Sequence, residues 1–327
     1  MQIGNQILRN PVARALQILG DRSTMLIMRD VFLGRHRFKE FFENSHLSKG
    51  TLTARLESLV ANDVLCKIQY SQKPPRYEYR LTDKGKALYS WALMIWQWES
   101  DWASRREVGL PQKLTHNVNK PHALVPVSVC RSCRQPVDSS NVTLVRLRDS
   151  AASVDFKQLH ESVGKQRRSG AKHDHSKDNS LAHITDIIGD RWSNLIIAAN
   201  FLGLKKFEDF QQQLKIATNI LTARLKLLTE LGVLDRKQYL SKPSRYEYHL
   251  SKKGRALYGQ TMALRQWVLD YFPPMETNFK LVHLSCGADL DTDVVCASCQ
   301  VCPKLEDVQF ERKDAEIKAT HRRLEET

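Results

Sequence analysis

Cysteine and histidine side chains gather in two short segments whose spacing is typical of metal binding. Six of the seven cysteines lie in these segments, and each segment contains a Cys-x-x-Cys pair. The later segment places His283, Cys286, Cys296 and Cys299 in the spacing H-x2-C-x9-C-x2-C, with Cys302 as a spare or alternate ligand. One imidazole and three thiolates form a tetrahedral donor set suited to structural zinc. A redox-active dithiol and ordinary thiols are the alternatives.

The earlier segment offers a different donor set. It contains His116, His122, Cys130 and Cys133, but asparagine or lysine stands where the later segment has Cys286. Either His122 substitutes as the fourth ligand or this segment has lost its metal, and we favour loss. In both cases protein side chains fill every coordination position, so a bound zinc would be structural rather than catalytic.

The elements that must position these segments occur in two repeated stretches of the sequence. The phrase LTARL occurs at 52–56 and at 221–225, and RYEY occurs at 76–79 and at 245–248, both 169 residues apart. The same offset aligns KPPRYEYRLTDKGKALY with KPSRYEYHLSKKGRALY without a gap. We interpret this as an internal duplication of one domain rather than a solenoid.

Each copy predicts four helices, a β-hairpin and a long final helix. Apolar residues recur at helical spacing and then at a period near two, where two strands flank a proline-containing loop. The first copy predicts helices at 11–19, 25–33, 38–44, 49–62 and 83–105, with strands at 64–70 and 77–81. The second predicts helices at 207–214, 217–231 and 252–271, with the hairpin tip at 241–245. The fold class is mainly α with small β-hairpins (α+β): two winged helix-turn-helix domains, each followed by a small Cys/His segment.

Composition and charge divide the 327 residues further. We predict a first winged domain at 1–105, a Cys/His segment at 106–137, a flexible linker at 138–179, a second winged domain at 180–272, a zinc-like segment at 273–302 and a charged tail at 303–327. Residues 1–105 hold 16 basic and 10 acidic side chains, and residues 180–272 hold 14 and 8. The basic excess in both winged domains, with a net charge of +14 overall, favours a nucleic-acid partner.

Other features limit the location and the chemistry. The longest apolar stretches, such as 195–204, are far shorter than the roughly 20 residues of a membrane helix. No signal peptide is evident, so we expect a cytoplasmic protein that does not bind membranes. Cys66 is isolated at a strand start and is expected to be a small buried hydrophobe.

The motifs GDRSTMLIMRDVFLGRHRFKEFFE, TLTARLESL, NDVLCKIQY and KPPRYEYRLTDKG resemble the HxlR-type branch of winged-helix transcription regulators, which are relatives of MarR. The resemblance covers residues 10–105 and 179–272. It implies a DNA-binding regulator that works as a homodimer of single-domain chains. One departure is that Ser23 of the first copy stands where the second copy keeps the family's tryptophan, Trp192.

The predicted DNA contacts lie at the start of each second helix of the motif and on each wing. Asn219 can pair with adenine and Lys49 with guanine or phosphate, while wing cations suit a minor-groove or phosphate role. Arg55 and Arg224 either contact phosphate or pair within their own domain. The candidate set is Ser48, Lys49, Thr51, Thr53, Arg55, Lys73, Arg76, Thr218, Asn219, Thr222, Arg224, Lys242 and Arg245.

We therefore predict a sequence-specific regulator that binds a double-stranded DNA operator through two fused winged helices acting as a pseudo-dimer. Pairing between chains, giving a homodimer with four winged helices, is the other arrangement. Alternative functions are a protein-binding adaptor and a thiol or zinc redox sensor that acts through the CxxC segments. No catalytic site is predicted, and no effector is indicated.

Overall fold

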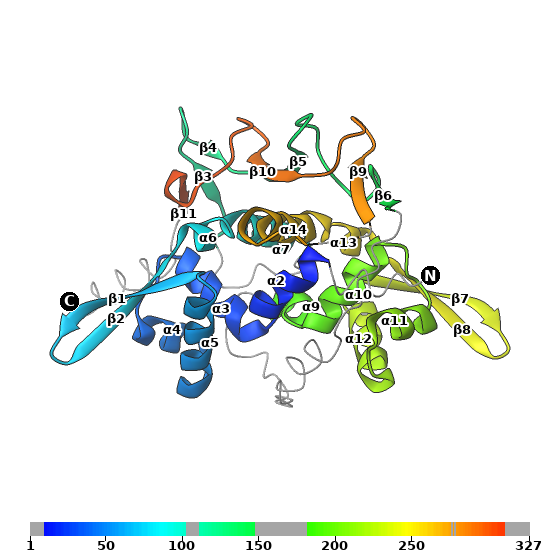
Figure 1. Cartoon of the computed structure of the whole chain (residues 1–327), viewed down its shortest axis with the longest axis horizontal. Coiled ribbons are helices and arrows are strands. Elements are labelled where there is room, and N and C mark those ends of the chain that lie inside the picture. The colour runs from blue at the N-terminus through cyan, green and yellow to red at the C-terminus, as the bar shows by residue number, and fades with distance from the viewer. Residues whose placement is uncertain (1–9, 103–110, 148–181, 276, 278, 311–327) are drawn as a thin grey trace, which may run out of the picture.

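The two copies form the two halves of one body that is related by an approximate twofold axis. The structure is a computed structural model that describes residues 10–102, 111–147, 182–275, 277 and 279–310. Figure 1 shows a hairpin wing at each end, two long helices across the middle and a layer of short strands above them. In the described parts of the chain, no helix is long and apolar enough to cross a membrane.

The first winged unit follows the predicted order. Its helices are α2 (Pro11–Leu19), α3 (Arg22–Phe32), α4 (Phe38–Ser45) and α5 (Lys49–Ala61), and its wing is β1 (Leu65–Gln72) with β2 (Pro75–Leu81). Local sequence sets these bounds. Asn10 and Asp21 cap α2 and α3 by accepting from Val12 and Thr24 backbone N–H groups. His46, in the left-handed region, ends α4 and turns the chain into α5.

The second winged unit repeats the first. It consists of α9 (Ala182–Ile188), α10 (Arg191–Phe201), α11 (Phe207–Leu214), α12 (Thr218–Glu230), β7 (Leu234–Ser241) and β8 (Ser244–Leu250). In both units the segment before the third helix adds a short bridge to the wing, at Arg37 with Glu78 and at Lys206 with Glu247. Each wing is therefore held at its base by backbone hydrogen bonds to its own helical unit.

The long final helix predicted in each copy is broken in two. The first copy has α6 (Asp83–Lys86) and α7 (Tyr89–Trp102), and the second has α13 (Lys252–Arg255) and α14 (Tyr258–Tyr271). Residues 103–105 lie outside the described residues. Thr82 caps the start of the short helix, and its hydroxyl also donates to the Asp63 carbonyl oxygen. A methyl group on Gly85 would lie 2.1 Å from the Val64 carbonyl oxygen, so the short helix sits directly on the wing base.

The long helices α7 and α14 cross at the twofold axis, where equivalent positions of the two copies meet. The indole N–H of Trp91 donates to Oε1 of Gln260 at 3.0 Å, and these residues are 169 apart. Nearby, Gly259 faces Met94 so closely that a methyl group there would lie 2.4 Å from the Met94 terminal carbon. Asp21 and Asp190 also pair across the axis in an isolated antiparallel bridge.

Apolar packing joins the two halves into one core. A single cluster of buried side chains runs from α2 and α3 through α7 and α14 to α10 and α12. Helix α2 of the first copy packs against α14 of the second. The halves therefore share buried surface, and separating them would expose it to water.

Except for β3 with β4, the described short strands above the long helices pair between the two copies. Strand β5 (Pro126–Cys130) pairs with β10 (Thr292–Cys296), and β6 (Val142–Arg146) pairs with β9 (Phe279–His283). Strand β11 (Val308–Phe310), which follows the 3-10 turn η1 (Leu305–Asp307), adds to β3 (Leu114–His116), and β3 pairs with β4 (His122–Ala123). The antiparallel pairs thus exchange segments across the twofold axis (Figure 1).

Two parts of the sequence prediction differ from this arrangement. The stretch expected to be a linker from residue 138 begins instead with β6, which is held by five paired residues of β9. The stretch expected to be a charged tail from residue 303 begins with η1 and β11. Both strands need a partner from the other copy, so a repeat read alone gives no signal for them. Residues 148–179 and 311–327 lie outside the described residues.

The close contact at Gly85 gives a stability prediction. Gly85→Ala forces a methyl group against backbone that cannot move freely, and we expect the free energy of unfolding to fall by about 2–3 kcal/mol. Gly50→Ala is the matched control, because a methyl group there meets nothing within 4 Å. We expect it to be neutral or to add up to about 1 kcal/mol of helix stability. Chemical denaturation of both variants measures the difference, and equal stabilities would contradict the contact.

Candidate nucleic-acid interface and metal-ligand clusters

Helices α5 and α12 are the second helices of the two helix-turn-helix motifs, and they lie on the same side of the body (Figure 1). Each buries one leucine face, namely Leu52, Leu56 and Leu59 in α5 and Leu221, Leu225 and Leu228 in α12. The opposite faces are left to solvent. Between α5 and α12, α2 and α9 fill the centre of the body.

The exposed start of α5 is polar. Ser48 caps the helix, accepting from the Thr51 backbone N–H at 3.2 Å, and its hydroxyl also bonds the Thr51 hydroxyl at 2.9 Å. The Lys49 ammonium lies 5.7 Å from the centre of the Phe42 ring. Thr53 is exposed one turn later. Lys49 and Thr53 are thus the side chains of this helix start that point freely to solvent.

The start of α12 presents a different surface. Ala217 stands in the cap position and provides no side-chain hydrogen bond. The Thr218 hydroxyl accepts from the Gln211 amide at 2.6 Å, and the Thr222 hydroxyl donates to the Thr218 carbonyl at 2.8 Å. Asn219 is exposed and has no side-chain hydrogen bond among the described residues. The two helix starts therefore offer a lysine in one half and an amide in the other.

The arginines of the repeated LTARL phrase are engaged within the protein. Arg55 lies 3.3 Å from the Asp21 carboxylate, and Arg224 lies 3.0 Å from the Asp190 carboxylate. Those two aspartates also cap α3 and α10 and pair with each other across the axis. Of the two roles left open from the sequence, the structure shows the ion pair. Both arginine side chains stay about one-third exposed.

The wing tips carry exposed cations. Lys73, Arg76 and Lys242 are exposed, and Arg76 has no ion-pair partner among the described residues. Arg245 approaches Glu208 at 3.7 Å, with half of each side chain exposed. This long, solvated pair is weak and leaves Arg245 able to contact another anion.

The sequence reading missed a set of cations that stack on wing aromatics. Lys67 lies 4.1 Å above the Tyr77 ring, and Arg236 lies 3.4 Å above the Tyr246 ring. Each pair joins opposite strands of one hairpin. Cation–π contacts of this kind contribute about 0.5–1 kcal/mol at exposed sites, so they stiffen the wings. Alternation of basic and aromatic residues along the hairpin strands was the available signal.

The histidines and cysteines of the two segments assemble into two tetrads, each built from both copies. One tetrad contains His116, His122, Cys296 and Cys299, and the other contains Cys130, Cys133, His283 and Cys286. The four ligand atoms of each tetrad lie within 4.8 Å of one another. Both tetrads can hold a metal ion.

The sequence-based grouping of these residues differs from the structure. It kept His283 with Cys296 and Cys299, and His116 with Cys130 and Cys133, because each set is close in sequence. The strand exchange of β5 with β10 instead carries each CxxC pair to the histidines of the other copy. His122 is a member of the tetrad that contains His116, so all four residues of the first segment, from which we favoured a loss of metal, belong to tetrads that could hold a metal ion. Cys302 belongs to neither tetrad.

Distances within the tetrads match tetrahedral coordination. Tetrahedral zinc with ordinary bond lengths places sulfur about 3.6 Å from nitrogen and about 3.8 Å from a second sulfur. His116 Nδ1 lies 3.4 Å from the Cys299 sulfur, and His283 Nδ1 lies 3.3 Å from the Cys133 sulfur. The Cys130 and Cys286 sulfurs are 3.9 Å apart.

In each tetrad, the first cysteine of the CxxC pair has a lowered pKa. Burial raises the pKa of Cys296, but hydrogen bonds from the backbone at Val125, Ser298 and Cys299 outweigh it and lower the pKa to about 6. Burial likewise raises the pKa of Cys130, and backbone hydrogen bonds in its own CxxC turn lower it overall. Metal ions bind the thiolate, so the first cysteine of each pair is prepared for binding.

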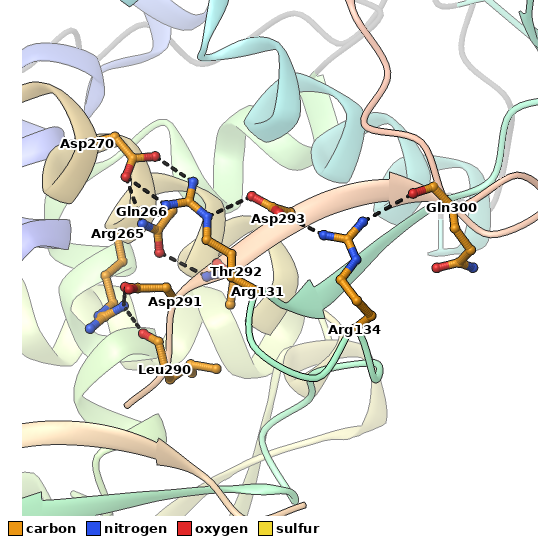
Figure 2. Close-up of polar contacts among 10 residues, drawn as sticks. All are labelled: Arg131, Arg134, Arg265, Gln266, Asp270, Leu290, Asp291, Thr292, Asp293 and Gln300. Carbon is orange, nitrogen blue, oxygen red and sulfur yellow. Dashed lines mark hydrogen bonds and ion pairs between the residues drawn. The ribbon is translucent and has the colours of Figure 1, made fainter. Parts of the chain in front are cut away.

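A one-sided network of ion pairs ties the first CxxC turn to the second copy (Figure 2). Arg131 donates to both oxygens of Asp270 on α14 at 2.9 and 2.7 Å, and to Asp293 on β10 at 2.8 Å. Arg134 adds a 2.9 Å bond to Asp293 and reaches the Gln300 carbonyl. The second CxxC turn has Ala297 at the place of Arg131, so this network exists in one direction across the axis. The sequence reading did not single out these residues.

The continuation of the network anchors β10 to α14. Gln266 donates to Asp270 at 2.9 Å and accepts from the Thr292 backbone at 2.9 Å. Arg265 donates to the Leu290 carbonyl at 2.7 Å and lies 4.0 Å from Asp291 (Figure 2). Strand β10, which carries Cys296 of one tetrad, is therefore held against α14 by side chains as well as by packing.

The fold and the exposed helix starts define a tandem winged helix-turn-helix protein with two joined Cys/His tetrads. The chain belongs to the HxlR-like helix-turn-helix family, which matches residues 18–107 and 187–276. It is 37% identical over 132 residues to the uncharacterized HTH-type transcriptional regulator Rv3095 of Mycobacterium tuberculosis, covering 40% of this chain and 82% of that one. The uncharacterized HTH-type transcriptional regulator YvaP of Bacillus subtilis is 36% identical over 90 residues, which are 27% of this chain and 83% of the relative.

Among solved structures, the chain is similar to PA1607, which is described as a candidate transcription factor. The two share 39% sequence identity over 39% of this chain and 91% of PA1607, with a TM-score of 0.35. The regulators Rv3095 and YvaP each match a span close to one copy of the duplicated unit, whereas the family matches this chain twice.

The Arg131 network gives a second stability prediction. Arg131→Ala removes bidentate hydrogen bonds that are partly exposed, and we expect the free energy of unfolding to fall by about 1–2 kcal/mol. Lys39→Ala, which breaks an exposed pair with Glu43 on α4, is the control and should change it by less than about 0.5 kcal/mol. Denaturation curves at pH 7 compare the two variants, and equal effects would contradict a stabilising network.

The same comparison depends on pH. Burial raises the pKa of Asp270, but hydrogen bonds from Arg131 and Gln266 lower it overall. A carboxylate with a lowered folded pKa contributes stability that is full above its unfolded pKa of about 3.9 and is lost as the pH falls through the folded value. The gap between wild type and Arg131→Ala should therefore be constant from pH 5 to 7 and shrink below about pH 4.

Proposed function

We propose that the chain is a sequence-specific DNA-binding transcription regulator whose two winged helices act together on one operator. The observation that supports it most directly is the placement of α5 and α12 on one side of the body, each with its polar start exposed. A helix that enters the major groove needs its N-terminal side chains free and polar. The exposed wing cations Lys73, Arg76, Lys242 and Arg245 would bind phosphates or the minor groove beside it.

In this proposal one chain supplies what a homodimer of single-domain chains would supply. Its two recognition helices would enter successive major grooves, which lie roughly 34 Å apart along DNA. The two half-sites would differ. Lys49 and Thr53 would read one, and Asn219 would read the other, with an amide suited to adenine and a lysine to guanine or phosphate. The operator would then be asymmetric, and the chain would bind it in one orientation.

The contacts at the twofold axis favour pairing between unlike copies. The equivalents of Gly259 and Met94 are Ser90 and Ala263. Pairing two first copies would press the Ser90 side chain against Met94, and pairing two second copies would leave a hole beside Ala263. Trp91 would also lose its acceptor Gln260 in a pair of first copies. An intrachain pseudo-dimer satisfies these contacts without a second chain.

We propose further that both tetrads bind structural zinc. One tetrad offers two imidazoles and two thiolates, and the other offers one imidazole and three thiolates. Both donor sets bind zinc in preference to hard cations such as magnesium or calcium. Every ligand is a protein side chain, which leaves no open position for a substrate. Each zinc would cross-link the two copies, because each copy supplies two of its four ligands.

The alternative functions have weaker support. A protein-binding adaptor does not need exposed cations at both wing tips. A dithiol redox sensor needs its thiols to be accessible and free, whereas the tetrad thiols face histidines at metal-ligand distances. An enzyme needs an open site, and we propose none.

The wing assignment predicts an effect on DNA affinity. Arg76→Ala combined with Arg245→Ala removes one cation from each wing, and we expect binding to weaken on every sequence tested. The slope of log K against log salt should become shallower by about 1.8, or about 0.9 for each lost phosphate contact. Fluorescence anisotropy at several salt concentrations measures it. Lys226→Ala, on the far end of α12 and paired with Glu230, is the matched loss of one charge. An unchanged slope in the wing variant would contradict the assignment.

The cross-copy tetrads predict a metal count that depends on which residues are changed together. Wild type should hold two zinc ions per chain by mass spectrometry under native conditions. His116→Ala with Cys296→Ser damages one tetrad, so one zinc should remain. His283→Ala with Cys296→Ser damages both, so zinc should be lost from both.

Grouping of the ligands within each copy gives the opposite pattern. In that case His283→Ala with Cys296→Ser would spare one zinc, and His116→Ala with Cys296→Ser would spare none. The two double variants therefore decide between the arrangements in one experiment. Absence of zinc from wild-type protein purified without chelator would contradict the metal proposal itself.

A further inference from the structure

A small apolar cavity lies in the first half of the body, between α3, α7 and β3 of the first copy and β11, which comes from the second copy. Its volume is about 80 Å³. Methionine and aromatic side chains dominate the wall, including Met25, Met28, Phe32, Tyr89, Trp96 and Phe310. Neither the helix-turn-helix contacts nor the tetrads use these side chains, and the aromatic surface has no assigned role.

The equivalent place in the second copy is built differently. A cavity of about 50 Å³ lies there against Phe201 and Tyr258, which correspond to Phe32 and Tyr89. Arg265 replaces Trp96 and Thr261 replaces Ala92 in its wall. Arg265 is held there by the Leu290 carbonyl. One half therefore has a larger aromatic cavity, and the other has a smaller and more polar one.

The polar groups of the first cavity are almost all engaged. Of the described residues that line it, Arg29 alone is charged, and it pairs with buried Asp30 at 2.9 Å. The Trp96 indole N–H donates to the Pro111 carbonyl at 2.8 Å. The Tyr89 hydroxyl has no hydrogen-bond partner among the described residues, although its ring packs on Phe32. Such a wall favours an uncharged ring.

We propose that this cavity binds a small, uncharged aromatic molecule and that the second copy does not. The volume is about half of the roughly 150 Å³ that holds benzene in a dry engineered cavity. The present cavity opens to solvent, so a single ring can enter with part of it at the mouth. Removal of ring surface from water provides the affinity.

The cavity also touches the element that holds a recognition helix. Helix α3 forms one wall, and its cap Asp21 pairs with Arg55 of α5. Strand β3, in the opposite wall, carries the tetrad ligand His116. A ring bound here therefore contacts both the helical unit and the tetrad layer of the first half. Its action as an effector rests on the proposed DNA binding, whereas its binding does not.

Fluorine NMR of the full-length zinc-loaded protein with fluorobenzene tests the site. We expect one fluorobenzene to bind per chain with a Kd below about 1 mM, within the affinity that seven heavy atoms can supply. 4-Fluorobenzoate, which adds a carboxylate to the same ring, should bind at least about tenfold more weakly because the wall leaves its charge without a partner. Equal binding of both compounds, or binding of neither, would overturn the proposal.

A matched pair of variants locates the ring. Leu33→Trp fills the first cavity and should weaken fluorobenzene binding by at least about tenfold, since the site is then occupied. Leu202→Trp makes the same change at the equivalent position of the second cavity and should leave the affinity within about twofold. Ala92→Leu fills the first cavity from α7 and serves if Leu33→Trp does not fold. Equal losses from Leu33→Trp and Leu202→Trp would overturn the assignment to one copy.

A DNA titration separates this inference from the proposed function. DNA affinity is measured first without fluorobenzene, which tests DNA binding alone. Saturating fluorobenzene should then change the affinity of wild type by at least about twofold and leave that of Leu33→Trp unchanged, because coupling is reciprocal between the sites. Tight DNA binding that fluorobenzene does not alter would reject the effector role while leaving the DNA proposal intact.

Discussion

The hydrogen bond between Trp91 and Gln260 joins equivalent positions of the two copies. The rest of the structure depends on this pairing of α7 with α14. A symmetric pair would place the same side chain on both sides of the axis. Here a buried donor meets an acceptor, and Gly259 makes room for Met94. With this contact formed, α7 and α14 cross, α5 and α12 lie on one side of the body, and the strands above exchange partners.

Two other features hold the two copies together. The Arg131 and Arg134 network ties the first CxxC turn to α14 and β10, and the second turn has no counterpart at Ala297. Each tetrad draws ligands from both copies, so a metal ion bound there would resist their separation. Fusion in one chain helps in the same direction, because pairing of the two copies is then intramolecular. In our account the duplication replaced a dimer and freed its halves to diverge.

Much of the helical unit could be predicted from the sequence, because its signals are local. Apolar spacing, the Ser48 cap and the change to a period of two before the wing gave most helix ends to within one or two residues, although α3 begins three residues before the predicted start. The break at Ala87–Leu88 was missed, because alanine and leucine give no helix-breaking signal there.

The tetrads show why local signals have a limit. The sequence prediction named all eight residues of the two tetrads but grouped them by proximity along the chain. Their true grouping depends on antiparallel pairing of β5 with β10, which are more than 160 residues apart. Strands β6 and β11 were missed for the same reason. Arg131 was overlooked because an exposed arginine gives no sign of a partner so far along the chain.

The central claim is that one chain contains both halves of a DNA-binding dimer. Light scattering during size-exclusion chromatography, with and without a short duplex from the protein's own promoter region, tests it most directly. The account predicts a free mass near 37.6 kDa and a complex of one chain with one duplex. A free particle of twice that mass, or two chains on each short duplex, would show that the copies pair between chains and would contradict it.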